Sequence, residues 1–383
     1  MNNRYLLVLL LCASGGCADS ATDTTPPPVN SRSIEPLPSP DTPDEVEAVA
    51  ALEMLGAKFK RNGDRNITEV NLRDTAATDD ALKHVVALKK VTSLLLNDLP
   101  ITDDGLALLV EWKAPIVNLD LRGCPIGNDG LAHLKGFKSL KAVRLNGIVK
   151  SPEDGVLNDI REPTTVDDAG LVHLAELTNL KVLALDGLWV SEVGLVSLDK
   201  LTNLEELYLK STTISDDGLL LLARYPKLKK LRLASNQISD AGLAHLSTIT
   251  TLEELDLSEN AQIFDAGLEH LSALTNLKKL NLWRVAISDA GVLKLAPLTN
   301  LEWLNLDNTQ LSDDGLPALK GMTKLTFLHV GSTTVSDAGL VNLEGLTTLK
   351  DLKVTRTAVT EEGVAALQPK LPDTDIQLLY IAP

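Results

Sequence analysis

A single segment recurs along most of this chain and limits what the chain can fold into. At 227–250 it reads KLKKLRLASNQISDAGLAHLSTIT, in which leucines are spaced L-x-x-L-x-L and a Ser-Asp-x-Gly run follows. The alternation of apolar and polar residues around Leu231 and Leu233 is typical of a strand with one buried face. Ser239 and Asp240 then offer an N-cap oxygen and a negative charge to a short helix.

One such unit cannot cover its own leucines, so units of equal length must stack and share a continuous core. Strands lie about 4.8 Å apart whereas helices are about 10 Å across, so the stack bends toward its strands. We therefore expect an α/β solenoid, a horseshoe with a concave parallel sheet and short convex helices. The predicted strands of twelve repeats begin at Ile67, Val91, Ile116, Leu140, Leu180, Leu204, Leu228, Leu252, Leu277, Leu301, Leu325 and Leu349.

A polar residue follows the strand in most repeats, as Asn236 and Asn260 show. Its side chain is expected to bond the backbone groups that the turn frees, because buried backbone polar groups need partners. Cys124 takes the same position and is most simply a buried free thiol.

This pattern resembles the leucine-rich repeat family, in the cysteine-containing, F-box-like subclass with xx(N/C/T)xIsDaGLxxL after the strand. LSDDGLPAL at Leu311–Leu319 and VSDAGLVNL at Val335–Leu343 carry the resemblance, which covers about four-fifths of the chain. The subclass includes substrate-recognition subunits of eukaryotic ubiquitin ligases and bacterial secreted proteins. The resemblance implies partner binding rather than chemistry, and no cofactor.

The first residues have the order of a secretory signal. Residues 1–17 read MNNRYLLVLLLCASGGC, with Arg4 before an apolar run and small residues before Cys17. Ser14-Gly15-Gly16-Cys17 resembles a bacterial lipobox, which implies lipidation of Cys17; ordinary cleavage near this residue is the alternative. We expect an exported protein, periplasmic or at the cell surface, with membrane attachment only through such a lipid anchor.

The rest of the chain divides by composition and periodicity. The predicted regions are a Pro/Thr/Ser-rich disordered tether at 18–43, an N-terminal capping helix at 44–66, the repeats at 67–372 and a C-terminal capping strand at 373–383. An insertion at 147–165 interrupts the repeat spacing and should project at one rim. It is either a tolerated loop, since loop closure costs little, or an element that helps to grip a partner together with Trp189.

Charge and motifs exclude several kinds of function. The net charge of −16 argues against nucleic acid, whose phosphates require a positive binding face. The histidines of successive repeats share one helix position about a helix diameter apart, which is too far for a metal site. We find no catalytic motif either, so the chain is predicted to be non-enzymatic and to bind no metal.

Residues between the inward leucines point out of the concave sheet. Aromatic residues make up only 3% of the chain, yet several fall on this face among cations. Such a combination is typical of an interface hot spot, although cross-strand packing would also place aromatic residues there. The predicted partner-binding residues are Tyr208, Arg232, Lys279, Trp283, Arg284, Trp303, Phe327, His329 and Lys353.

Three functions follow from this surface. The leading hypothesis is a scaffold that binds a protein or peptide across its concave face. The alternative is a module for cell-wall or extracellular glycans, in which the aromatic rings stack on sugars. An enzyme using Asp256, Asp307 and His329 as acid/base groups is a third hypothesis, but no orienting motif accompanies these residues.

Overall fold

The computed structural model describes residues 43–147 and 164–379. The predicted signal at 1–17 with Cys17, the tether up to residue 42, and residues 148–163 of the insertion lie outside the described residues. In the described part, the strands are β1 Lys58–Arg61, β2 Ile67–Asn71, β3 Ser93–Leu95, β4 Asn118–Asp120, β5 Ala142–Asn146, β6 Val182–Asp186, β7 Glu206–Tyr208, β8 Lys230–Arg232, β9 Glu254–Asp256, β10 Lys279–Asn281, β11 Trp303–Asn305, β12 Phe327–His329, β13 Asp351–Lys353 and β14 Asp375–Gln377.

Short helices alternate with these strands. The α-helices are α1 Pro43–Met54, α2 Asp79–Val85, α3 Asp103–Ala107, α4 Asn128–Ala132, α5 Asp168–Leu171, α6 Glu192–Val196, α7 Asp216–Leu222, α8 Asp240–Leu246, α9 Leu268–Leu271, α10 Asp289–Val292 and α11 Glu361–Leu367. Segments of 3-10 helix lie at His133–Gly136, Val172–Leu174, Leu293–Leu295, Leu316–Gly321 and Gly339–Leu343.

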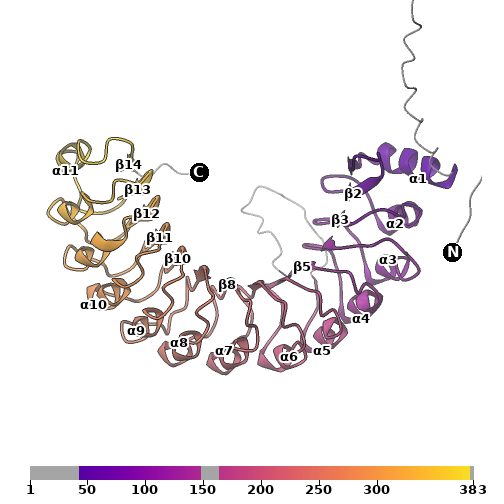
Figure 1. Cartoon of the computed structure of the whole chain (residues 1–383), viewed down its shortest axis with the longest axis horizontal. Coiled ribbons are helices and arrows are strands. Elements are labelled where there is room, and N and C mark those ends of the chain that lie inside the picture. The colour runs from indigo at the N-terminus through magenta and orange to yellow at the C-terminus, as the bar shows by residue number, and fades with distance from the viewer. Residues whose placement is uncertain (1–42, 148–163, 380–383) are drawn as a thin grey trace, which may run out of the picture. The chain divides into compact units, whose positions relative to one another are not determined.

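The strands pair in chain order from β1 to β14 in one sheet. Every neighbouring pair from β2 onward is parallel, whereas β1 runs antiparallel to β2. Considered by itself, the unit that contains the repeats curves into an open arc with strands on the inner side and helices on the outer side (Figure 1). The predicted solenoid with a concave parallel sheet and short convex helices is confirmed.

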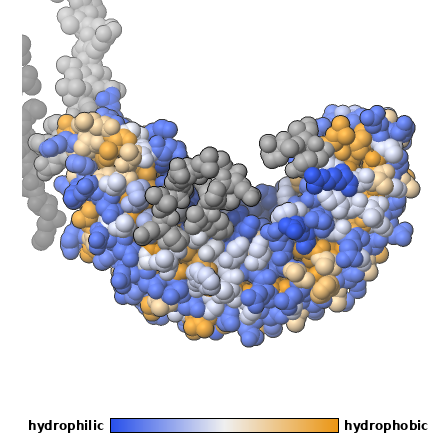
Figure 2. Space-filling view, turned by 180° about the vertical axis from the view of Figure 1, so that it is seen from behind, coloured by the Kyte–Doolittle hydropathy of each residue, from blue (hydrophilic) through white to orange (hydrophobic). Residues whose placement is uncertain are grey.

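The repeated leucines form one continuous core between the sheet and the helices. In the repeat at 227–250, Leu228, Leu233 and Leu246 have no exposed surface and Leu231 is 2% exposed. Burying a leucine stabilises the folded state by about 1.5–3 kcal/mol, so each repeat depends on its neighbours for several such contributions. Figure 2 shows hydrophilic residues along much of the hollow, with apolar patches over the outer edge.

In most repeats, the turn after the strand is held by the polar residue predicted to bond it. Asn236 donates its side-chain N–H to the carbonyl oxygens of Leu209 at 2.7 Å and Leu233 at 3.0 Å, and its Oδ1 accepts from the Thr212 N–H at 3.0 Å. Asn260 repeats this arrangement one repeat later. These bonds confirm the expected role of the position and join adjacent repeats.

The residue before this position has a left-handed backbone in nearly every repeat. Ser211, Ser235, Arg284 and Arg356 have φ angles of 54°, 55°, 54° and 55°. An L-residue there costs roughly 1–2 kcal/mol, and the bonds of the turn must offset it. Most repeats have a residue other than glycine at this position, so the sequence does not indicate the left-handed backbone.

The Ser-Asp-x-Gly run does more than start a helix. Ser239 caps α8 as expected, because its Oγ accepts from the Ala241 N–H at 3.2 Å. Asp216 of the preceding repeat accepts both from the Ser239 N–H at 2.9 Å and from the Ser239 hydroxyl at 2.5 Å. The same two bonds join Asp313 to Ser336, so these aspartates form an inter-repeat ladder, here called the aspartate ladder.

Both ends differ from the expected boundaries. The capping helix expected at 44–66 stops at Met54, because Gly56 adopts a φ of 90° and the Ala57 N–H reaches back to the Leu52 carbonyl at 3.0 Å. Lys58–Arg61 then forms β1 on the edge of β2. At the other end, the described part of the capping strand expected at 373–383 forms β14, Asp375–Gln377, which pairs with β13.

Candidate partner-binding surface

Two rows of side chains face the hollow of the sheet, because each short strand places its outer two residues outward and its middle leucine inward. The strand register aligns these residues across neighbours. From β7 to β13 the first row contains Glu206, Lys230, Glu254, Lys279, Trp303, Phe327 and Asp351. The second row contains Tyr208, Arg232, Asp256, Asn281, Asn305, His329 and Lys353.

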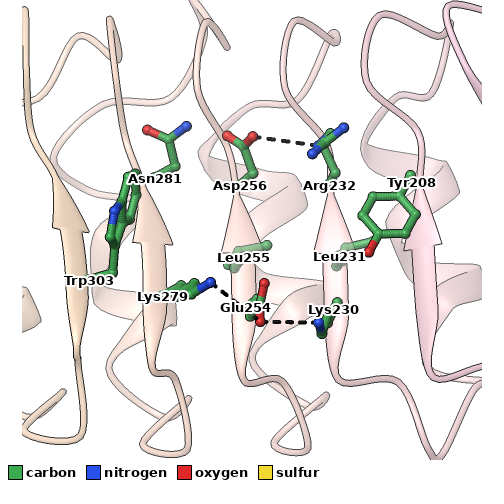
Figure 3. A pocket seen from close by; sticks show the side chains of 10 residues that line it. All are labelled: Tyr208, Lys230, Leu231, Arg232, Glu254, Leu255, Asp256, Lys279, Asn281 and Trp303. Carbon is green, nitrogen blue, oxygen red and sulfur yellow. Dashed lines mark ion pairs between the residues drawn. The ribbon is translucent and has the colours of Figure 1, made fainter. Parts of the chain in front are cut away.

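The first row from β7 to β10 alternates in charge. The Lys230 ammonium lies 3.6 Å from a Glu206 oxygen and 3.3 Å from a Glu254 oxygen, and Lys279 lies 3.9 Å from Glu254 (Figure 3). Burial opposes the charged form of Lys230, but the two carboxylates outweigh it and raise its pKa. The row is therefore close to neutral as a whole.

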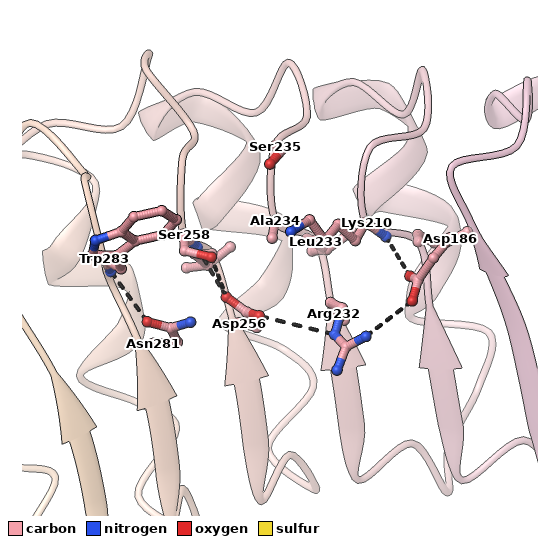
Figure 4. Close-up of polar contacts among 12 residues, drawn as sticks. Asp186, Lys210, Arg232, Leu233, Ala234, Ser235, Asp256, Ser258, Asn281 and Trp283 are labelled. Carbon is pink, nitrogen blue, oxygen red and sulfur yellow. Dashed lines mark hydrogen bonds and ion pairs between the residues drawn. The ribbon is translucent and has the colours of Figure 1, made fainter. Parts of the chain in front are cut away.

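The second row continues the pairing around Arg232. Its guanidinium lies 2.9 Å from an Asp186 oxygen and 3.9 Å from an Asp256 oxygen (Figure 4). It also lies over the Tyr208 ring, 5.1 Å from the ring centroid. The Tyr208 hydroxyl donates to Glu206 at 2.7 Å, and burial together with this carboxylate raises the pKa of the phenol.

A groove of about 220 Å³ lies above these charges. Tyr208 and Trp303 are at its two ends, and Lys230, Arg232 and Glu254 are among the residues that line it (Figure 3). The strands that carry Tyr208 and Trp303 are four positions apart in the sheet, which corresponds to about 19 Å. The groove can therefore take an extended segment of several residues.

Aromatic rings and a cation stack in sequence beyond this groove. The rings of Trp303 and Phe327 are parallel within 6° with centroids 4.9 Å apart. The Lys353 ammonium lies over the Phe327 ring, 5.6 Å from its centroid. The His329 ring meets the Phe327 ring edge-on, with ring centroids 6.4 Å apart. We call Trp303, Phe327 and Lys353 the aromatic wall.

Trp283 does not join the aromatic wall. It lies two residues beyond Asn281, the last residue of β10, and its backbone N–H donates to the Asn281 Oδ1 at 3.2 Å (Figure 4). Its ring contacts Arg284 instead, with the guanidinium 5.3 Å from the centroid. Trp283, predicted as a partner-binding residue together with Trp303 and Phe327, is therefore separated from them, because it lies beyond the end of its strand.

A second pocket, of about 130 Å³, lies on the other side of the aromatic wall. Burial lowers the pKa of His329, whereas the Asp307 carboxylate 3.7 Å away acts in the opposite direction. This separation is beyond hydrogen-bond distance. The pocket is lined by Asp307, His329, Ser332, Lys353, Thr355, Arg356 and Gln377.

Most of the predicted partner-binding residues share these two rows. Trp283 and Arg284 lie beyond them, at the end of β10. Sequence reasoning did not include Asp186, Glu206 or Glu254, which pair with the predicted cations. The alternation of Glu206 and Glu254 with lysines at equivalent repeat positions was the signal that could have identified these two residues.

Other candidate chemistry is sparse in the described residues. No group of three or more metal-ligating side chains is present in 43–147 and 164–379. Burial raises the pKa of the Cys124 thiol to about 12, and its Sγ donates to the Leu96 carbonyl. Asp256 accepts from the Ser258 hydroxyl at 2.7 Å and lies on β9, three strand positions from His329 on β12. Among the described helices, none has the length and apolar character to cross a membrane.

The fold and this surface define an open solenoid with a groove on its concave parallel sheet. A family model described as Leucine Rich repeat matches residues 116–134, 200–223, 226–247 and 248–272. These four segments of the chain therefore match the leucine-rich repeat.

Solved structures show the same fold. An internalin, InlF, of Listeria monocytogenes matches with a TM-score of 0.60 at 22% identity, over 90% of this chain and 96% of that one. A leucine-rich repeat protein of Leptospira interrogans matches with a TM-score of 0.52 at 19% identity, over 77% of this chain and 74% of that one. No curated protein sequence matches the chain. At these identities the likeness concerns the fold, and the F-box-like subclass stays a prediction.

Proposed function

We propose that this protein is an exported, non-enzymatic scaffold that binds a protein or peptide on the concave face from β7 to β13. Solenoids of this kind commonly use their concave surface for binding. The observation that carries the proposal is the groove of about 220 Å³ with Tyr208 and Trp303 at its ends. Tryptophan and tyrosine are enriched among the residues that dominate binding energy.

The floor of the groove suits a polypeptide. Its carboxylates and cations are paired with each other, so a ligand of one charge gains little there. An extended peptide carries both hydrogen-bond donors and acceptors, and it can contact both kinds of paired group. The half-buried Trp303 ring then offers an apolar contact at one end.

A glycan is the less favoured ligand. Sugar recognition of the kind considered above uses open aromatic faces, but Phe327 stacks on Trp303 and Arg232 lies over the Tyr208 ring. Competition by soluble glycan fragments separates the two classes. An acid/base role is also less favoured, because Asp307 and His329 are 3.7 Å apart and no orienting motif accompanies them.

Export rests on residues 1–17, and attachment to a membrane rests on Cys17. The charge, apolar run and small residues in this segment support secretion. Labelling of cells of a suitable bacterial host with palmitate tests the anchor, with Cys17→Ala expected to abolish the label. Label that persists in the variant would exclude lipidation at this position.

The Trp303→Ala variant tests the binding surface. Peptides are first selected from a displayed random library on the wild-type protein, and their affinities are then measured for each variant. Trp303→Ala should weaken binding by about 1 kcal/mol or more, about fivefold, because a hot-spot ring is lost. The change should leave the fold intact, since the ring is only partly buried.

Trp189→Ala is the matched control. Trp189 is 76% exposed and lies after β6, outside the two rows. Unchanged affinity in Trp303→Ala with a lower melting temperature would mean that the aromatic wall serves packing alone. A larger loss in Trp189→Ala than in Trp303→Ala would move the binding surface to the rim.

A further inference from the structure

The second pocket departs from the electrostatics of the rest of the chain. The chain has a net charge of −16, yet Lys353 and Arg356 line this pocket with Asp307 as its one carboxylate. The groove on the other side of the aromatic wall pairs its cations with carboxylates. The two cavities therefore differ in how their lysines are paired, although they lie on neighbouring strands.

Lys353 is the cation that the pocket presents to a ligand. No carboxylate in the described residues lies within ion-pair distance of its ammonium, which lies 5.6 Å from the centroid of the Phe327 ring. A cation over an aromatic ring keeps its charge and can still form an ion pair with a carboxylate. Lys353 is thus held in place without being neutralised.

His329 adds a hydrogen-bond donor to the same pocket. The charged groups that face it are Asp307, at the end of the neighbouring strand β11, and Lys353 on β13. Burial lowers the pKa of the imidazole and so favours its neutral form, in which one ring nitrogen still carries a proton. A bound anion would favour the protonated ring.

We propose that the pocket formed by His329, Lys353 and Arg356 is a carboxylate subsite for the peptide that occupies the groove. This inference rests on the proposed function. The peptide crosses the aromatic wall from β11 to β13, about 10 Å, which an extended chain spans in about three residues. The protein would then recognise a peptide with an apolar side chain that contacts Trp303 and a carboxylate about three residues away that binds in the second pocket.

A carboxylate fits the pocket better than a phosphate. Asp307 lines the same pocket, and its negative charge would repel a dianion more strongly than a monoanion. The carboxylate can be an acidic side chain or the carboxyl terminus of the peptide. Both present the same planar pair of oxygens.

The first experiment needs no partner. The side-chain resonances of His329 are assigned with His329→Asn and followed by NMR over pH in sodium chloride, sodium acetate or sodium phosphate at equal ionic strength. Acetate should raise the pKa of His329 by on the order of one unit at saturation, because an anion is placed beside the ring. Lys353→Met, which keeps the length of the side chain, should remove this shift.

Lys350→Met is the matched control, since Lys350 lies just before β13 and pairs with Asp373 at 3.8 Å. It should keep the acetate effect. No difference between acetate and chloride, or an equal shift in Lys353→Met, would overturn the proposal. A larger shift of the His329 pKa in phosphate than in acetate would mean that the pocket binds a phosphate rather than a carboxylate.

The second experiment uses the peptides selected on the wild-type protein. Each is made with its acidic side chains as amides, or with its carboxyl terminus as an amide. The amide that replaces the bound carboxylate should weaken binding to the wild-type protein about tenfold, since a hydrogen bond to a charged group is lost. The same amide should change binding to Lys353→Met little. Whichever amide weakens binding shows whether the bound carboxylate is an acidic side chain or the carboxyl terminus of the peptide.

The outcomes separate the two proposals. Peptides that bind equally well with or without each carboxylate overturn the subsite but leave the binding scaffold in place. A library from which no peptide is retained contradicts the proposed function, and the acetate titration still decides whether the pocket takes a carboxylate.

Discussion

The concave face is built from one strand pattern, yet its middle and its C-terminal part differ in chemistry. From β7 to β10 the outward residues are mostly charged and pair across strands, as Lys230 does with Glu206 and Glu254. From β11 to β13 the same positions carry Trp303, Phe327 and Lys353, which stack instead. Because the leucines beneath are alike, the outward residues can vary freely while the scaffold stays constant.

The largest expected effect tests whether the scaffold is the same under both regions. Leu255→Ala in β9 and Leu328→Ala in β12 should each destabilise the fold by about 2–5 kcal/mol, since both leucines are buried and leave cavities. Chemical denaturation of the two variants measures these losses. A much smaller loss in one variant would show that the core differs between the regions.

Removing residues of the aspartate ladder should give the next largest loss in free energy of unfolding. Asp216→Ala, at the middle region, and Asp313→Ala, at the C-terminal region, should each cost about 1–3 kcal/mol in free energy of unfolding, because the Ser N–H and hydroxyl of the next repeat lose their acceptor. Denaturant titration compares the two. Equal losses would support one scaffold under two surfaces.

Glu192 supplies the matched test of that ladder. It stands where most other repeats have Asp, and its Oε2 is buried without a hydrogen-bond partner in the described residues. Glu192→Asp should let the carboxylate reach Ser215 and stabilise the fold by about 0.5–1.5 kcal/mol. A destabilised variant would show that the ladder geometry does not extend to this repeat.

The smallest effect concerns the paired charges. Lys230→Met should change the free energy of unfolding by about 0–1 kcal/mol, because partly exposed ion pairs contribute little. Any loss should shrink as salt is added, since salt screens the wild-type pairs. A loss larger than that of Asp216→Ala would mean that the middle region depends on its surface charges.

Much of the fold could be predicted from the sequence. The spacing of residues such as Leu231 and Leu233 indicated the strand, and Ser239 indicated the helix start, because both signals are local. The end of α1 at Met54 and strand β1 could not be predicted in the same way. A short segment such as Lys58–Arg61 becomes a strand only when β2 is beside it.

The site was predicted less completely. Trp303 and Phe327 lie together because β11 and β12 are aligned, whereas Trp283 follows its strand by two residues. The pairing of Arg232 with Asp186 also depends on side chains from strands two positions apart in the sheet. Such contacts depend on register and side-chain direction, which a pattern of residue types does not specify.

The repeat by itself determined that the chain stacks, that its leucines are buried and which residues face outward, because each follows from a period within one segment. The tertiary structure decided which outward residues meet. It separated Trp283 from the aromatic wall, turned the aspartates into acceptors for the next repeat, and placed paired charges and an unneutralised Lys353 on opposite sides of two stacked rings. These outcomes depend on distances between repeats, and such distances exist only once the repeats are stacked.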